Sequence, residues 1–131
     1  MTPPLRRTPA VLAVLALAFG LVACGSDDGR PAVEDWEPVW LATQAMVPGD
    51  AEIAKAGENA CGPVLGDLRA SREELLPAPT GALDEHARAW LAAAEGLMLD
   101  CPTDADERSA AFEELDRLAG RIETGIDVVE G

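Results

Sequence analysis

Two amphipathic segments, separated by a short run of helix breakers, constrain the fold of this chain more than any other feature. Apolar side chains in residues 83–101 recur at spacings of three and four, which defines one stripe of a helix. Residues 63–76 show a similar pattern, and the intervening Pro-Ala-Pro-Thr-Gly of residues 77–81 suits the turn of an αα-hairpin. We therefore expect two antiparallel helices here. The stripe of the second segment is Leu83, Ala87, Trp90, Leu91, Ala94, Leu97, Met98 and Cys101.

Two cysteines fit this hairpin. Cys61 stands at the start of the first segment and Cys101 at the end of the second, and those ends are neighbours in an antiparallel pair. A disulfide between them would close the open end of the hairpin and contribute on the order of 4 kcal/mol in the chain-entropy model. Metal ligation and a redox site are the alternatives, but there is no CxxC spacing and only one histidine to supply further ligands.

A third helix is expected over residues 104–129. Asp104 is suited to cap it, with Glu107 three residues later as in a capping box. Gly120 and Gly125 interrupt an otherwise regular pattern. The expected apolar stripe is Ala111, Phe112, Leu115, Leu118, Ala119, Ile122, Ile126 and Val129.

The segment before the hairpin is less regular. In residues 33–47 we expect a helix that begins near Pro38, because a proline restricts the residue before it to extended conformations. Pro63 fits the first position of the first hairpin helix, and a kinked continuation from a cap at Asp50 is the alternative. The predicted fold class is all-α: a small three- to four-helix bundle with a disulfide-closed antiparallel αα-hairpin.

The N-terminus has the three parts of a secretory signal peptide. Arg6 and Arg7 make its start positive, residues 10–23 are apolar or small, and Leu21-Val22-Ala23-Cys24 precedes a polar stretch. The apolar run is shorter than the roughly 20 residues that a transmembrane helix needs. The sequence therefore predicts a signal peptide over residues 1–23.

The four residues Leu21-Val22-Ala23-Cys24 resemble the lipobox of bacterial lipoproteins, and the whole layout resembles small actinobacterial lipoproteins of undetermined role. The resemblance implies that the Cys24 thiol carries acyl chains such as palmitate and becomes the first residue after cleavage. It also implies a lipid-anchored protein on the outer face of the bacterial cytoplasmic membrane. An ordinary signal peptide with an incidental cysteine is the alternative.

Three regions follow from these assignments: a signal peptide (1–23), a lipidated flexible tether (24–32) and an acidic helical domain (33–131). The chain has 10 basic and 24 acidic residues, and removal of Arg6 and Arg7 with the signal peptide would change its net charge from −14 to −16. So acidic a domain would repel the phosphates of nucleic acids, and we expect no nucleic-acid partner. Cationic ligands or metal ions could be attracted, but a solvated helix surface also explains the charges.

No constellation of catalytic residues stands out. His86 is the only histidine, and it lies off the apolar stripe of its helix, where a solvent-facing position explains it. Adjacent acids on a helix point about 100° apart and form no facing pair. Trp36, Trp40 and Trp90 could line a ligand pocket, although such residues are more often core.

Three functions remain open. The first is a non-enzymatic interaction or structural protein of the cell envelope, which could meet an unknown envelope protein. The second is a binding module for a small apolar or cationic ligand. The third, an enzyme with an unrecognised acidic site, is the weakest, and we expect no enzymatic activity, no cofactor and no metal.

Overall fold

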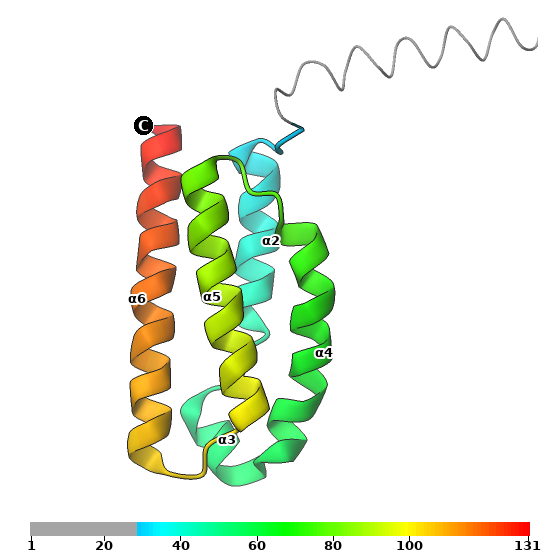
Figure 1. The fold of residues 1–131 in the computed structure, drawn as a ribbon, viewed down its shortest axis with the longest axis vertical. Coiled ribbons are helices and arrows are strands. Elements are labelled where there is room, and N and C mark those ends of the chain that lie inside the picture. Colours follow the sequence, from blue (N-terminus) through cyan, green and yellow to red (C-terminus); the bar gives the residue numbers. More distant parts are fainter. Residues whose placement is uncertain (1–28) are drawn as a thin grey trace, which may run out of the picture. The chain divides into compact units, whose positions relative to one another are not determined.

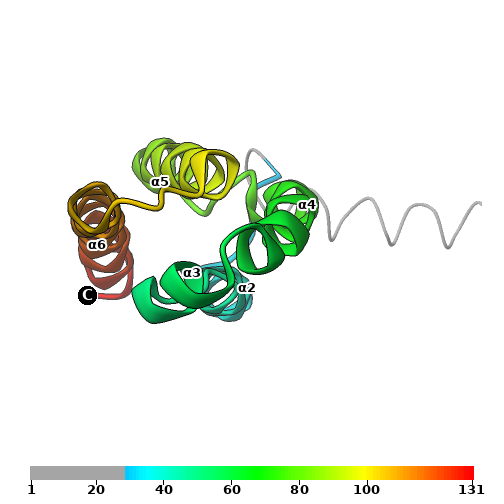
Figure 2. The ribbon, with the colours of Figure 1, turned by 90° about the horizontal axis from the view of Figure 1, so that it is seen from below.

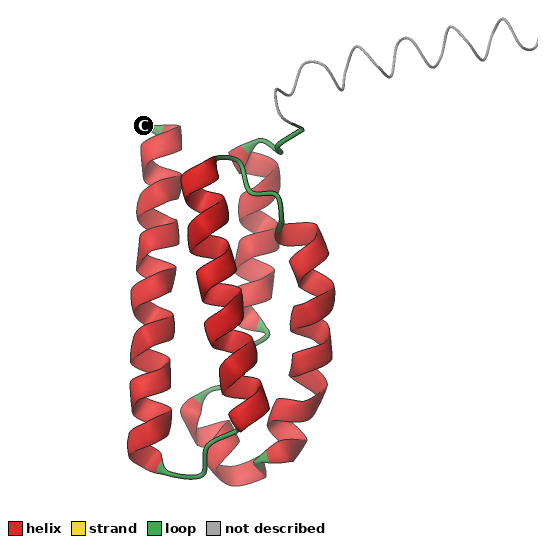
Figure 3. Cartoon of the chain, viewed as in Figure 1, coloured by secondary structure: helices red, strands yellow, loops and turns green. Residues whose placement is uncertain are grey.

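The computed structural model describes residues 29–131. The predicted signal peptide and Cys24 lie outside this range. Within it, the chain is helical and contains no strand (Figure 3). The helices are α2 (Val33–Ala45), α3 (Asp50–Ala56), α4 (Glu58–Leu75), α5 (Gly81–Asp100) and α6 (Ala105–Glu130) (Figure 1).

The four long helices of residues 31–131 form an up-and-down bundle. Consecutive long helices run in opposite directions, and the short α3 lies at the end of the bundle where the chain passes from α2 to α4 (Figure 1). Helix α5 packs against both α4 and α6, and α2 contacts the same two helices from the other side, so that the ring is closed (Figure 2). The predicted all-α bundle is confirmed, with α3 as an additional short helix.

The apolar stripe of α5 forms the centre of the core. Every predicted member of this stripe, from Leu83 to Cys101, is buried. The stripe of α6 is buried from Leu115 to Ile126, but Val129 is 43% exposed because it lies near the end of the helix. Ala111 and Phe112, the first two members of the α6 stripe, are only partly buried. Spacing alone therefore identified the core face of α5 and the middle of the core face of α6.

The helices α4 and α5 form the predicted antiparallel hairpin, and a disulfide closes it. Cys61 lies in the first turns of α4 and Cys101 directly follows α5, with their Cα atoms 6.1 Å apart. Both cysteines are buried. Cys101 adopts a left-handed conformation (φ 41°, ψ 61°), which ends α5 one residue before Pro102.

The expected start of the first helix near Pro38 is wrong. Helix α2 begins at Val33, so that Pro38 lies inside it and cannot donate to the carbonyl of Glu34. An interior proline costs about 3 kcal/mol. Val33 and Trp36 are both buried, and burial of an apolar side chain of this size contributes about 1.5–3 kcal/mol. Their burial offsets the cost of the proline.

Neither predicted start of the first hairpin helix is correct. The chain breaks at Gly57 (φ 56°, ψ −127°), a conformation with positive φ that glycine adopts without strain. Helix α4 then begins at Glu58, so that Pro63 is an exposed interior residue rather than the first. Asp50 is not a cap either: it is the first residue of α3, after the N-cap Gly49.

Gly125, one of the two glycines that interrupt the pattern of α6, has a packing role. A Cβ atom at Gly125 would lie 2.7 Å from Cδ2 of Leu83, whose side chain is fully buried. A Cβ at Gly120 would meet no atom within 4 Å. Gly125 therefore allows α6 to approach the start of α5 closely, whereas Gly120 has no such role. Asp104 caps α6 as predicted, because its side chain accepts a hydrogen bond of 3.0 Å from the backbone N–H of Glu107.

Candidate functional site

The three tryptophans meet in the core. The rings of Trp36 and Trp40 are stacked with centroids 6.4 Å apart, and Trp40 and Trp90 are edge to face at 5.0 Å. All three side chains are at most 2% exposed. The structure thus brings together the residues predicted as a possible ligand pocket, and it fills the space between them with their own rings.

A small hollow nevertheless reaches Trp90. It has a volume of about 200 Å³ and lies between the end of α2, α5 and α6. Phe112 and Leu115 form part of its wall. A space of this size is below the roughly 300–1,000 Å³ that is typical of small-molecule sites, so it is a poor candidate for the predicted pocket.

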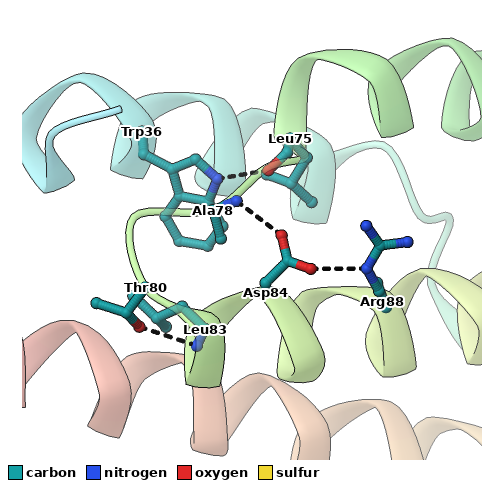
Figure 4. A network of polar contacts seen from close by, with 7 residues as sticks. All are labelled: Trp36, Leu75, Ala78, Thr80, Leu83, Asp84 and Arg88. Carbon is teal, nitrogen blue, oxygen red and sulfur yellow. Dashed lines mark hydrogen bonds and ion pairs between the residues drawn. The ribbon is translucent and has the colours of Figure 1, made fainter. Parts of the chain in front are cut away.

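A polar network fixes the turn between α4 and α5 (Figure 4). The indole Nε1 of Trp36 donates to the backbone oxygen of Leu75 at 2.7 Å, which satisfies a carbonyl at the end of α4. Asp84 accepts from the backbone N–H of Ala78 at 3.0 Å and from Nε of Arg88 at 2.7 Å. These contacts hold the turn on the bundle and give it no reactive group.

The same turn contains the N-cap of α5. The hydroxyl of Thr80 accepts a hydrogen bond of 3.1 Å from the backbone N–H of Leu83 (Figure 4). A threonine cap of this kind is typically worth about 1 kcal/mol. This bond fixes where α5 begins.

Arg108 connects the opposite end of the bundle. Its side chain is 8% exposed, and Nε lies 2.8 Å from Oδ1 of Asp50 at the start of α3. Its Nη1 donates to the backbone oxygen of Thr103 at 2.8 Å and to that of Pro102 at 3.4 Å. These partners account for the burial of Arg108, which links α3, α6 and the loop after α5.

A second, larger hollow lies between the first half of α5 and the second half of α6. We call it the α5–α6 groove; its volume is about 890 Å³, within the range of ligand sites. Apolar atoms dominate its lining, which also includes two arginines and one histidine. The lining residues are Thr80, Ala82, His86, Arg117, Gly120, Arg121, Thr124, Gly125, Val128 and Val129.

The two arginines of the groove differ in their partners. Arg117 donates twice to Glu114, which is one turn earlier on α6. This hydrogen bonding lowers the pKa of the Glu114 carboxyl and raises the pKa of Arg117, since each charge favours the other. Among the described residues no ion pair involves Arg121.

The described part of the chain offers little for metal chemistry or membrane insertion. Across residues 29–131, no three metal-ligating side chains of His, Cys, Asp or Glu gather at one point. No helix in this range combines the length and the apolar character needed to cross a membrane. The polar contacts described above are structural, and they leave the α5–α6 groove as the candidate functional site.

Comparison of the chain with protein-family models, with curated proteins and with solved structures found no match. Residue roles therefore come from the geometry alone.

Sequence reasoning missed most of the groove. His86 was expected to face solvent, yet it is half-buried and lines the groove. One signal was present in the sequence: Arg117, Arg121 and Val128 recur at intervals of four and seven on α6, as one face of a helix does. Their position beside His86 depends on how α5 and α6 pair, which no local pattern specifies.

Proposed function

We propose that this chain is a lipid-anchored protein of the bacterial cell envelope, and that its helical domain binds a partner rather than catalysing a reaction. The observation that carries the proposal is Leu21-Val22-Ala23-Cys24, which ends an apolar segment with a positive start. In this proposal two acyl chains at Cys24 supply the attachment, since one chain alone holds a protein only marginally.

The Cys61–Cys101 disulfide supports the compartment. Disulfides persist outside the cytoplasm, whereas cytosolic thiols are kept reduced. A disulfide that closes a two-helix hairpin in a small domain is typical of a secreted protein. It agrees with a domain that works on the outer side of the membrane.

The charge of the chain supports attachment by lipid rather than by the protein surface. With 24 acidic and 10 basic residues, the chain has a net charge of −14. Anionic headgroups would repel such a surface. Attachment to a membrane therefore needs the acyl chains.

Replacement of the anchoring residue tests the proposal. We expect Cys24→Ser to move the protein from the membrane fraction to the soluble extracytoplasmic fraction, because serine receives no thioether-linked lipid. The matched control is Ser26→Ala, which lies two residues further on and should stay with the membrane. Retention of Cys24→Ser at the level of the unchanged protein would contradict the proposal.

A second candidate function is a binding module for a small ligand. The α5–α6 groove favours it, because its volume of about 890 Å³ and its mostly apolar lining suit a ligand. The sequence predicts an apolar or cationic ligand, with the tryptophans as a possible pocket. The arginines of the groove favour an anionic ligand at a different place.

A further inference from the structure

The α5–α6 groove has a cationic end in a strongly acidic chain. His86, Arg117 and Arg121 line it, and none of its ten lining residues is Asp or Glu. The whole chain has more than twice as many acidic as basic residues, 24 against 10. Glu114 pairs with Arg117 and also feels the charge of Arg121. Arg121 lies one turn of α6 beyond Arg117, is exposed and forms no ion pair among the described residues, so its guanidinium can donate to an anionic partner.

The other end of the groove is apolar. Val128 and Val129 in the last turns of α6 are 73% and 43% exposed, and both line the groove. Because Gly125 faces Leu83, the start of α5 runs alongside these valines, and Ala82 lines the same end. Exposed valines in this position leave apolar surface in water that a ligand could cover.

The polar and apolar ends of the groove are separated along the axes of α5 and α6. Val128 follows Arg121 by seven residues, which is about 10 Å along a helix. On the antiparallel α5, His86 follows Ala82 by four residues, about one turn. The groove therefore has Arg121 and the imidazole of His86 at one end and apolar surface at the other.

We propose that the α5–α6 groove binds a small anionic amphiphile, namely a long-chain carboxylate. Its carboxylate lies against Arg121, with His86 beside it, because a guanidinium binds a carboxylate through two parallel hydrogen bonds. Its hydrocarbon chain covers Ala82, Val128 and Val129. The inference rests on the second candidate function, ligand binding, and names the ligand class.

A free amphiphile fits this groove better than the surface of a membrane does. A bilayer of anionic lipids would repel a chain with a net charge of −14. A single carboxylate in the groove instead meets Arg121, which forms no ion pair among the described residues, and none of the lining residues is itself acidic. The volume of about 890 Å³ also lies within the range of drug-sized ligands.

Titration calorimetry of the full chain with monomeric oleate tests the proposal. We expect binding of one oleate per chain, and weaker binding of oleyl alcohol by about tenfold or more, because the alcohol lacks the charge that Arg121 binds. Absence of oleate binding would overturn the proposal. Oleyl alcohol that binds as tightly as oleate would overturn the role of the cationic end. Binding of the Cys24→Ser chain, which lacks the acyl anchor, to vesicles of phosphatidylglycerol without binding of monomeric oleate would also overturn it, in favour of a membrane surface.

Two pairs of variants locate the ligand. Arg121→Gln should weaken oleate binding about tenfold, whereas Arg69→Gln, an exposed arginine of α4 outside the groove, should leave it unchanged. Val128→Ser should weaken binding as well. Its control is Leu99→Ser, since Leu99 is 58% exposed on α5 and does not line the groove. Equal effects within either pair would place the ligand elsewhere and overturn the assignment.

The ligand and the anchor can fail separately. Cys24→Ser should bind oleate as the unchanged chain does, and Arg121→Gln should stay in the membrane fraction. Loss of oleate binding on its own therefore refutes the groove, and membrane retention of Cys24→Ser on its own refutes the anchor.

Discussion

The indole Nε1 of Trp36 in α2 donates a hydrogen bond of 2.7 Å to the backbone oxygen of Leu75 at the end of α4. The bond links two residues that are 39 positions apart in the chain. It lies within the core, where Leu75 is fully buried and Trp36 is 1% exposed. The first helix of the bundle thus holds the end of the α4–α5 hairpin in place.

Removal of this hydrogen bond should destabilise the domain. We expect Trp36→Phe to lower the free energy of unfolding by about 1–3 kcal/mol beyond its loss of volume, because a buried carbonyl loses its donor. Trp40→Phe is the matched control: Trp40 is equally buried, and its Nε1 has no hydrogen-bond partner among the described residues. Urea unfolding measures both variants, and equal losses of stability would contradict the role of this bond.

The two glycines of α6 should respond oppositely to alanine. Gly120→Ala should stabilise the domain by up to about 1 kcal/mol, since alanine is the better helix former and its Cβ meets nothing. Gly125→Ala should be less stable than Gly120→Ala by about 1–3 kcal/mol, because its Cβ would lie 2.7 Å from Leu83. Thermal unfolding compares the two, and a gain of stability in both would show that Leu83 moves aside freely.

Reduction of the disulfide should cost stability through the unfolded chain. The cysteines are 40 residues apart, and release of such a loop costs about 4 kcal/mol in the chain-entropy model. We expect Cys61→Ala/Cys101→Ala and the reduced unchanged protein to unfold at similarly lower urea concentrations. A reductant should not affect the double variant. An unfolding midpoint of the unchanged protein that ignores the reductant would contradict this account.

The buried arginine should matter more than an exposed one. Arg108→Met removes hydrogen bonds from a charged group to Asp50 and to Thr103, and we expect a loss of about 1.5–3 kcal/mol. Arg117→Met breaks an ion pair whose two side chains are 49% and 47% exposed, and it should cost less stability than Arg108→Met, because water and salt screen an exposed pair. Urea unfolding measures both. If Arg117→Met costs as much, burial does not determine the contribution of these arginines.

Much of the fold could be predicted from local patterns. The stripe that ends at Cys101 has regular spacing, and the breakers at residues 77–81 and the position of Cys61 agree with it. Two independent signals therefore indicated one hairpin. The starts of α2 and α4 could not be predicted from local rules, which place a proline at or before the start of a helix. Pro38 lies inside α2, where burial of Trp36 offsets its cost, and Pro63 lies inside α4, which begins directly after the break at Gly57.

The candidate site was less predictable than the fold. Arg121 and Val128 share one face of α6, but that face forms a groove only because it packs beside His86 of α5. Trp36, Trp40 and Trp90 could have lined a pocket or formed the core, and the structure shows that they form the core. Chain regions far apart in sequence form the groove, and no local spacing encodes their pairing.

The mass of the intact protein, extracted from membranes and kept unreduced, tests the central claim of a lipid-anchored, disulfide-closed domain. We predict the mass of residues 24–131 with acyl chains at Cys24, two hydrogens lighter than the reduced form because of the Cys61–Cys101 bond. A protein that still contains residues 1–23, or one whose Cys24 carries no lipid, would contradict the account.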